Sequence, residues 1–121
     1  MELLIENVLN IGVEEFYRTS RYKVSLIVLL VNSKDKNAFN ILDNATRQTD
    51  IVQQLSSELI VVFLSHTEYE KSLLFIEKVK KKFDFTYNMS EFKESEVEFI
   101  ENLFLRNIEN FLSSDTLLNS L

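Results

Sequence analysis

The amino-acid sequence predicts an α+β fold of the ferredoxin-like or palm-like kind, in which the order β-α-β-β-α-β is flanked by a further helix at each end. Apolar residues recur at steps of three and four in some segments, as in helices that bury one face. In others they run continuously or alternate, as in strands. The length of 121 residues suits one domain, so we expect a single domain over residues 1–121 with an antiparallel sheet at its centre.

The first predicted helix covers residues 2–20. Its apolar residues follow one another at steps of four, four and three and so form one stripe: Ile5, Leu9, Val13 and Phe16. Leu4 and Val8 widen this stripe enough to pack on a sheet or on a second copy of the chain. Gly12 lies within the pattern and lowers the helix propensity there.

The sheet core is expected within residues 23–90. Residues 24–31 form a run of leucine and β-branched residues, which is typical of a central strand covered on both faces. A short helix over residues 34–46 follows this strand. Its predicted inner face consists of Ala38, Phe39, Leu42 and Ala45.

Three more strands are predicted after this helix. Residues 50–55 and 58–64 are joined by Ser56 and Ser57, which favours an antiparallel hairpin, although two serines are a weaker turn signal than Asn-Gly. The last strand covers residues 83–89, where polar residues alternate with the apolar residues Phe83, Phe85, Tyr87 and Met89.

Two capping boxes predict where the remaining helices begin. Thr67 and Glu70 precede a helix that runs to residue 82, with an inner face of Tyr69, Leu73, Ile76 and Val79. Ser95 and Glu98 mark the first turn of a C-terminal helix over residues 95–112, with an apolar face of Val97, Ile100, Phe104, Ile108 and Phe111. We expect residues 113–121 to form a frayed tail.

The charge balance argues against a nucleic-acid partner. The formal net charge is −6, whereas a general nucleic-acid binder needs a positive surface. The dense basic run lies at the end of a predicted helix, where cations complement the helix dipole: Lys78, Lys80, Lys81 and Lys82. A solvated helix end therefore explains this run.

Compartment and membrane association follow from what the chain lacks. It has no cysteine, which excludes disulfides, thiolate metal sites and cysteine nucleophiles. The longest strongly apolar run, residues 24–31, is far shorter than the ~20 residues that a membrane-spanning helix needs. The start of the chain carries Glu2 and Glu6 and lacks the basic residues of a secretory signal. We expect a cytoplasmic protein with no membrane contact.

No catalytic motif emerges from the sequence. His66 is the only imidazole, and its predicted polar turn favours a solvent-facing or locally hydrogen-bonded side chain. A single glycine cannot form either of the glycine-rich phosphate loops. The carboxylate pairs Glu14 with Glu15 and Asp84 with Glu91 fit solvated surfaces. We therefore expect no catalytic residue, no metal site and no cofactor. A minor alternative is that the chain is an enzyme whose active site matches no known motif.

One segment resembles a known family. Residues 47–64 are similar to the signature hairpin of GGDEF domains, the diguanylate cyclases, in which an R-x-x-D element precedes the GGDEF turn by five residues. Arg47 and Asp50 take the R and D places here, and five residues lead from them to the turn segment Ser56, Ser57, Glu58, Leu59 and Ile60. Weaker similarity to the family's first helix and strand lies at Glu15, Arg18, Arg21, Tyr22, Ser25 and Leu26. The resemblance covers residues 10–112 and implies the family's palm-like fold.

The departures from the family imply that cyclase activity is lost. Ser56 and Ser57 stand where the family has glycines that let the backbone approach nucleotide phosphates. Leu30 and Leu59 stand where it has acidic ligands of the catalytic metal, and leucine offers no oxygen to Mg²⁺. The segment between the first strand and the hairpin, where the family recognises guanine, is shorter. The resemblance thus implies a catalytically inactive signalling or regulatory domain.

The R-x-x-D element has a separate role in the family, as an inhibitory site for cyclic di-GMP. The resemblance therefore makes Arg47 and Asp50 candidate ligand-binding residues and cyclic di-GMP a candidate ligand, because a guanidinium can fork onto guanine or phosphate and a carboxylate can accept from guanine N1 and N2. Alternatively, Arg47 caps a helix and Asp50 opens a strand. The chain would then be an interaction module that binds a protein partner or forms a homodimer without a nucleotide.

Overall fold

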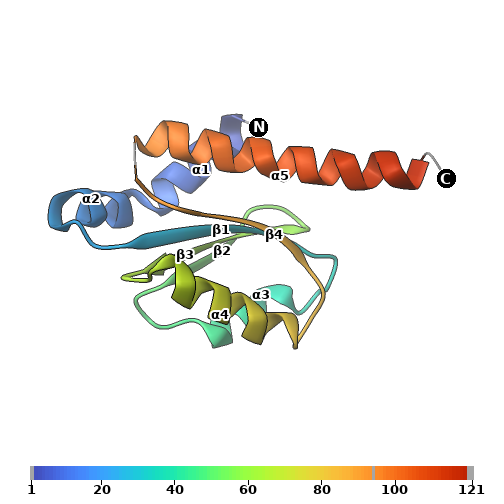
Figure 1. The fold of residues 1–121 in the computed structure, drawn as a ribbon, viewed down its shortest axis with the longest axis horizontal. Helices are drawn as coiled ribbons and strands as arrows, with labels where there is room; N and C mark the ends of the chain where they lie inside the picture. Colours follow the sequence, from blue (N-terminus) through green and yellow to red (C-terminus); the bar gives the residue numbers. More distant parts are fainter. Residues whose placement is uncertain (1, 94, 120–121) are drawn as a thin grey trace.

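The computed structural model describes the backbone of residues 2–93 and 95–119, and the side chains of these residues as far as Asn107. Its helices are α1 (Glu2–Ile11), α2 (Val13–Tyr22), α3 (Ala38–Ala45), α4 (Tyr69–Lys80) and α5 (Glu96–Asn119). Its strands are β1 (Leu26–Asn32), β2 (Ile51–Gln54), β3 (Leu59–Ser65) and β4 (Thr86–Glu91). The central part follows the predicted order β-α-β-β-α-β (Figure 1).

The four strands form one antiparallel sheet in the order β2-β3-β1-β4. At the centre of β1, Leu29 stands opposite Val62 of β3 on one side and opposite Met89 of β4 on the other. Strands β2 and β3 pair as neighbours, so the predicted hairpin across Ser56 and Ser57 is confirmed. The α+β, palm-like fold is confirmed with it.

Helices cover both faces of the sheet, with α1, α2 and α5 on one side and α3 and α4 on the other (Figure 1). The residues of β1 divide between two hydrophobic clusters by alternation, as the pleat requires. Leu26, Val28 and Leu30 join the cluster that α5 covers. Ile27, Leu29 and Val31 join the cluster beneath α3 and α4. Strand β1 is therefore the doubly covered central strand that its apolar run predicts.

The N-terminal segment forms two helices, so the predicted single helix over residues 2–20 is wrong. The chain turns at Gly12, where a Cβ atom would lie only 2.3 Å from Cε2 of the Phe63 ring. Because glycine has no side chain, the backbone can approach that ring closely, and α2 sets off in a new direction (Figure 1). The turn exposes Val13, which the predicted stripe placed inside, whereas Val8 and Phe16 are buried as that stripe predicts.

Helix α4 begins later than its capping box predicts. The Thr67 hydroxyl donates to the carbonyl of Ser65, 2.9 Å away, and no side chain caps the helix at Glu68. The buried face of the helix also differs from the predicted one: Ile76 and Val79 are buried as expected, but Tyr69 and Leu73 are exposed. Ser72 is buried in their place.

Helix α5 is longer than predicted and buries a different set of residues. Ile100 and Phe104 face the sheet as expected, whereas Val97 is exposed and Leu103 is buried. The predicted inward side chains of Ile108 and Phe111 lie outside the described side chains. We expected a frayed tail from residue 113, but the helix continues to Asn119. Neither glycine nor proline interrupts it. Residues 120–121 of that tail lie outside the described residues.

Strand β4 begins after Phe83 and Phe85, so the predicted start of that strand is three residues too early. Both side chains are nevertheless buried in the same cluster that receives Tyr87 and Met89, as their alternation predicts. Among the helices within residues 2–93 and 95–119, none is long and apolar enough to cross a bilayer.

Candidate functional site

The R-x-x-D element lies in the loop between α3 and β2, and its two charged residues bind each other. Arg47 Nε donates to Asp50 Oδ2 and Arg47 Nη2 donates to Asp50 Oδ1, and both donor–acceptor distances are 3.1 Å. The backbone N–H of Arg47 adds a third hydrogen bond to Oδ2, at 2.9 Å. This two-pronged pairing is the geometry that a guanidinium and a carboxylate prefer.

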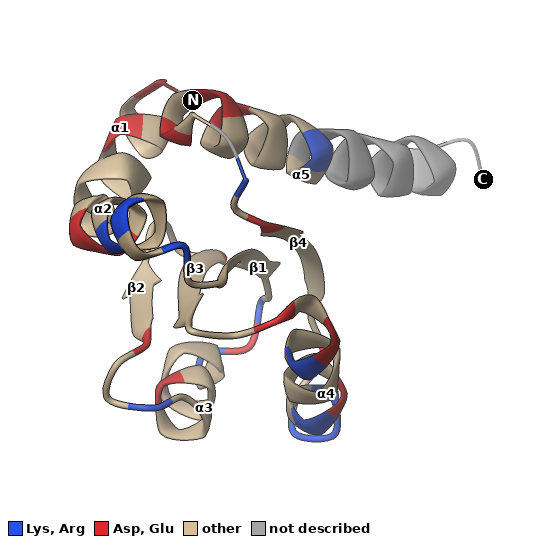
Figure 2. Ribbon diagram, turned by 60° about the vertical axis from the view of Figure 1, so that its left-hand side comes forward, with Lys and Arg blue, Asp and Glu red and all other residues tan. Residues whose placement is uncertain are grey.

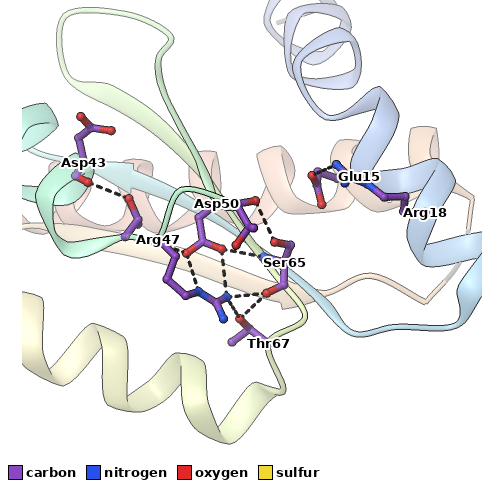
Figure 3. A network of polar contacts seen from close by, with 9 residues as sticks. Glu15, Arg18, Asp43, Arg47, Asp50, Ser65 and Thr67 are labelled. Carbon is purple, nitrogen blue, oxygen red and sulfur yellow. Dashed lines mark hydrogen bonds and ion pairs between the residues drawn. The ribbon is translucent and has the colours of Figure 1, made fainter.

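The pair also connects the loop to the end of β3 (Figure 3). Arg47 Nη2 donates to the Ser65 carbonyl at 2.5 Å and to the Thr67 hydroxyl at 2.8 Å. In return, the Ser65 N–H donates to Asp50 Oδ1 at 3.0 Å, and its hydroxyl donates to the Thr49 carbonyl at 2.9 Å. Arg47 therefore does not cap α3; it closes a network that joins the α3–β2 loop to the β3–α4 turn.

Burial separates the two members of the pair. The Asp50 side chain is only 2% exposed and each of its oxygens accepts two hydrogen bonds, so it has no free acceptor direction. The Arg47 side chain is 56% exposed, and its Nη1 makes no hydrogen bond within the described part of the chain. The hydrogen bond to Asp50 is the main cause that raises the pKa of Arg47 above its ordinary value, against the opposing effect of burial.

A cleft of about 600 Å³ lies next to this network, between the α3–β2 loop and the N-terminal helices. The loop side contributes Gln48, Thr49 and Asp50, and His66 closes the end at the β3–α4 turn. Arg47 itself does not line it. Of the two predicted ligand residues, Asp50 thus lies at the edge of a cavity, whereas Arg47 donates to the backbone carbonyl of Ser65.

The opposite wall of the cleft carries an ion pair from α2 (Figure 3). Arg18 Nη2 lies 2.5 Å from Glu15 Oε1, and the Glu15 side chain is only 7% exposed. The expectation that Glu14 and Glu15 both face solvent is therefore wrong for Glu15. The sequence reveals Arg18 only through its resemblance to the family's first helix, and nothing in the sequence indicates that Arg18 and Asp50 line one cleft.

The turn that corresponds to the family's active loop connects β2 and β3. The N–H groups of Leu55 and Ser56 both donate to the Leu59 carbonyl, at 2.8 and 3.2 Å, which closes the turn on itself. Leu59 and Ile60, which follow it, are buried. Leu30 is 0% exposed in the middle of β1, opposite Val61. Both positions that would need a metal ligand thus belong to the hydrophobic core.

A second cleft, of about 590 Å³, lies between that turn and the end of β1. Asp35, Glu58 and Asp84 line it together with Lys34. Even so, no group of three carboxylate or imidazole side chains that could hold a metal ion occurs in the part of the chain that the structure describes. The predicted absence of a metal site at the turn remains a prediction.

His66 occupies the turn after β3 and has a positive φ of 51°. Its side chain is exposed, as the polar turn predicts. The left-handed backbone there reverses the chain so that α4 can pack back on the sheet.

Comparison with known proteins shows the fold alone. No family model matches the sequence, and no curated protein matches it. Among solved structures, the chain is similar to a crystal structure of a DGC (diguanylate cyclase) protein from Thermotoga maritima, with a TM-score of 0.61 and 16% identity over 84% of this chain and 88% of that one. The GGDEF-like, palm-like fold that the hairpin resemblance implies therefore has a structural counterpart.

Proposed function

We propose that this chain is a GGDEF-like domain without cyclase activity that serves in signalling or regulation. The observation that supports this proposal is the burial of Leu30 and Leu59 at the two positions where the resemblance expects metal ligands. Phosphoryl transfer between two nucleoside triphosphates depends on divalent cations that neutralise the phosphates. Buried leucine side chains can supply neither the charge nor the oxygen atoms for such ions.

The test of this proposal is a turnover assay with GTP in the presence of Mg²⁺ and, separately, of Mn²⁺. We expect no cyclic di-GMP and no pyrophosphate above the level of a protein-free control, even at high protein concentration. Product that grows in proportion to protein concentration and disappears with a chelator would overturn the proposal.

A second function, cyclic di-GMP binding, is favoured by the cleft beside the R-x-x-D network. The cleft brings Arg18, whose Nη2 is paired with Glu15, and the polar groups of the α3–β2 loop to a common cavity. Arg47 stands next to it with Nη1 free of protein partners among the described residues. Two guanidinium groups near one cavity suit a ligand that carries two phosphates and two guanine edges.

The role of Asp50 in this second function differs from the one the resemblance implies. Its oxygens already accept four hydrogen bonds from the chain itself, so a guanine edge would have to displace one of them. We therefore propose Arg47 and Arg18 as the groups that contact the ligand. Asp50 then acts through Arg47, by fixing the direction of the guanidinium.

Titration calorimetry with cyclic di-GMP tests this second function. Binding to the unaltered chain, and loss of binding in Arg47→Ala, are the results we expect. A bound ligand would also raise the free energy of unfolding, by ~2.7 kcal/mol at a ligand concentration one hundred times Kd. Absence of heat and of any thermal shift at millimolar ligand would remove the receptor function and leave an interaction module.

A further inference from the structure

The outward face of α2 is a polar and aromatic surface that starts at the rim of the cleft beside the R-x-x-D network, where Val13 and Glu14 line that cleft, and continues to the end of the helix. Phe16 and Glu15 turn inward, whereas Val13, Tyr17 and Tyr22 are exposed. Arg21 lies 5.9 Å from the Tyr17 ring centre and 5.7 Å from that of Tyr22, and its Nη1 donates to the Tyr17 hydroxyl at 2.7 Å. These stacked side chains hold one another in place on the surface.

The residue types on this face are those that protein interfaces favour. Tyrosine and arginine are enriched at the centres of interfaces, because each offers a large contact area with a polar end. Rings already fixed by a stacked guanidinium lose little conformational freedom on binding. Tyr17, with 58% of its surface exposed, lies in the middle of this face.

The charges on the same face are complementary to themselves. Glu14 and Arg21 are seven residues apart and therefore lie on one side of the helix, ~10 Å from each other along its axis. The acidic residues Glu14 and Glu15 lie in the first turn of α2 and Arg21 lies in its last turn; Figure 2 shows both signs of charge on this helix. If a second α2 runs antiparallel across the first, each Glu14 meets the other copy's Arg21, and the two Tyr17 rings meet at the two-fold axis.

We infer that the chain forms a symmetric dimer through α2, with a second copy of the chain as the partner. This surface differs from the stripe that the sequence indicates, since Leu9 and Phe16 pack into the core of their own chain. A helix of ten residues gives a small contact, so the expected dissociation constant is roughly micromolar rather than nanomolar.

The exposed face of α4 is the competing surface, with Tyr69, Leu73 and Leu74. Its charges do not show a single acidic end and a single basic end, because Glu70 is followed at once by Lys71 and Glu77 by Lys78. No ring on that face carries a stacked cation among the described contacts. Self-pairing of α4 is therefore less specified than self-pairing of α2.

Charge reversal and charge exchange test the dimer. Sedimentation equilibrium on the full chain should show a dimer that dissociates on dilution. Glu14→Arg and Arg21→Glu should each raise the dissociation constant by about tenfold or more, because each places like charges opposite one another. The double variant should associate more tightly than either single variant, since the charge pairing is restored with its signs exchanged, but less tightly than the unaltered chain, because the stacking of Arg21 on Tyr17 and Tyr22 is lost. Glu77→Arg on α4 makes the same charge change and should have no effect.

Three outcomes would overturn the inference. A monomeric mass of the unaltered chain at about 0.5 mM excludes a dimer of this strength. A dimer that both single reversals leave unchanged uses another surface. A double variant no better than the single variants shows that Glu14 and Arg21 do not face each other. Circular dichroism of every variant separates loss of association from loss of fold.

Discussion

Arg47 binds Asp50 through two parallel hydrogen bonds of 3.1 Å, and the same guanidinium nitrogen that closes one of them reaches the carbonyl of Ser65 on the next strand. The R-x-x-D element, which resembles the family's ligand-binding motif, is thus a connection between the loop before β2 and the turn after β3. Any ligand that draws on Arg47 would act on that connection, which gives a physical route from binding to a change in the β3–α4 turn.

The first prediction concerns the stability that this connection provides. Asp50→Ala should lower the free energy of unfolding by roughly 3 kcal/mol, because it leaves the Ser65 N–H and the inner side of Arg47 without an acceptor. Arg47→Ala should cost roughly 1–3 kcal/mol, because the guanidinium itself is half exposed but its loss takes two of the four hydrogen-bond donors from the buried Asp50 carboxylate. Urea denaturation measures both. Asp43→Ala, at an exposed position, is the control and should be neutral. Equal losses of unfolding free energy in the Asp43 and Asp50 variants would contradict a stabilising role for the Asp50 network.

The second prediction sets packing against helix propensity at Gly12. Alanine is favoured over glycine inside a helix by about 1 kcal/mol, so propensity alone predicts that Gly12→Ala stabilises the chain. The new Cβ would lie 2.3 Å from the buried Phe63 ring, and we expect a net loss of roughly 1–3 kcal/mol instead. Chemical denaturation gives the sign. Ser20→Ala, on the exposed side of α2, should be neutral or slightly stabilising.

The third prediction concerns Leu30 in β1, the position where the hairpin resemblance leads one to expect a metal ligand. Leu30→Asp should leave the chain unfolded or strongly destabilised, because it puts a carboxylate into a fully buried position between β3 and β4. Leu30→Val should cost only about 1 kcal/mol, as a change in shape within an apolar site. Thermal melts with and without Mg²⁺ test this. A folded Leu30→Asp variant that Mg²⁺ stabilises would show that the site accepts a metal after all.

The fourth prediction concerns Arg18 and applies if cyclic di-GMP binds. Arg18→Lys keeps the positive charge but loses the planar fork, so affinity should fall about tenfold with little change in melting temperature. Calorimetry and a melt on the same sample separate the two effects. Arg106→Lys, next to a different cleft at the β4 edge, is the matched control. Unchanged affinity in Arg18→Lys would remove Arg18 from the proposed site.

Local pattern was sufficient for most of the fold. The continuous apolar run of β1 and the alternation from Phe83 to Met89 predict strands, because side-chain period and burial are local properties. Local pattern also predicts the hairpin at Ser56 and Ser57 and the order of the elements from β1 to β4. The sequence also has leucine at positions 30 and 59, where the hairpin resemblance leads one to expect carboxylates.

Tertiary contact decided the rest. Gly12 ends α1 because of a ring that lies fifty-one residues further along the chain, and a helix pattern contains no information about that ring. Thr67 accepts from Arg47 and donates to Ser65 instead of capping α4, since a hydroxyl has several partners within reach and only the folded chain selects among them. In the same way, the sequence presents Arg47 and Asp50 as two groups available to a ligand. The folded chain first engages them with each other, because burial of the Asp50 carboxylate demands a hydrogen-bond donor for every acceptor it removes from water.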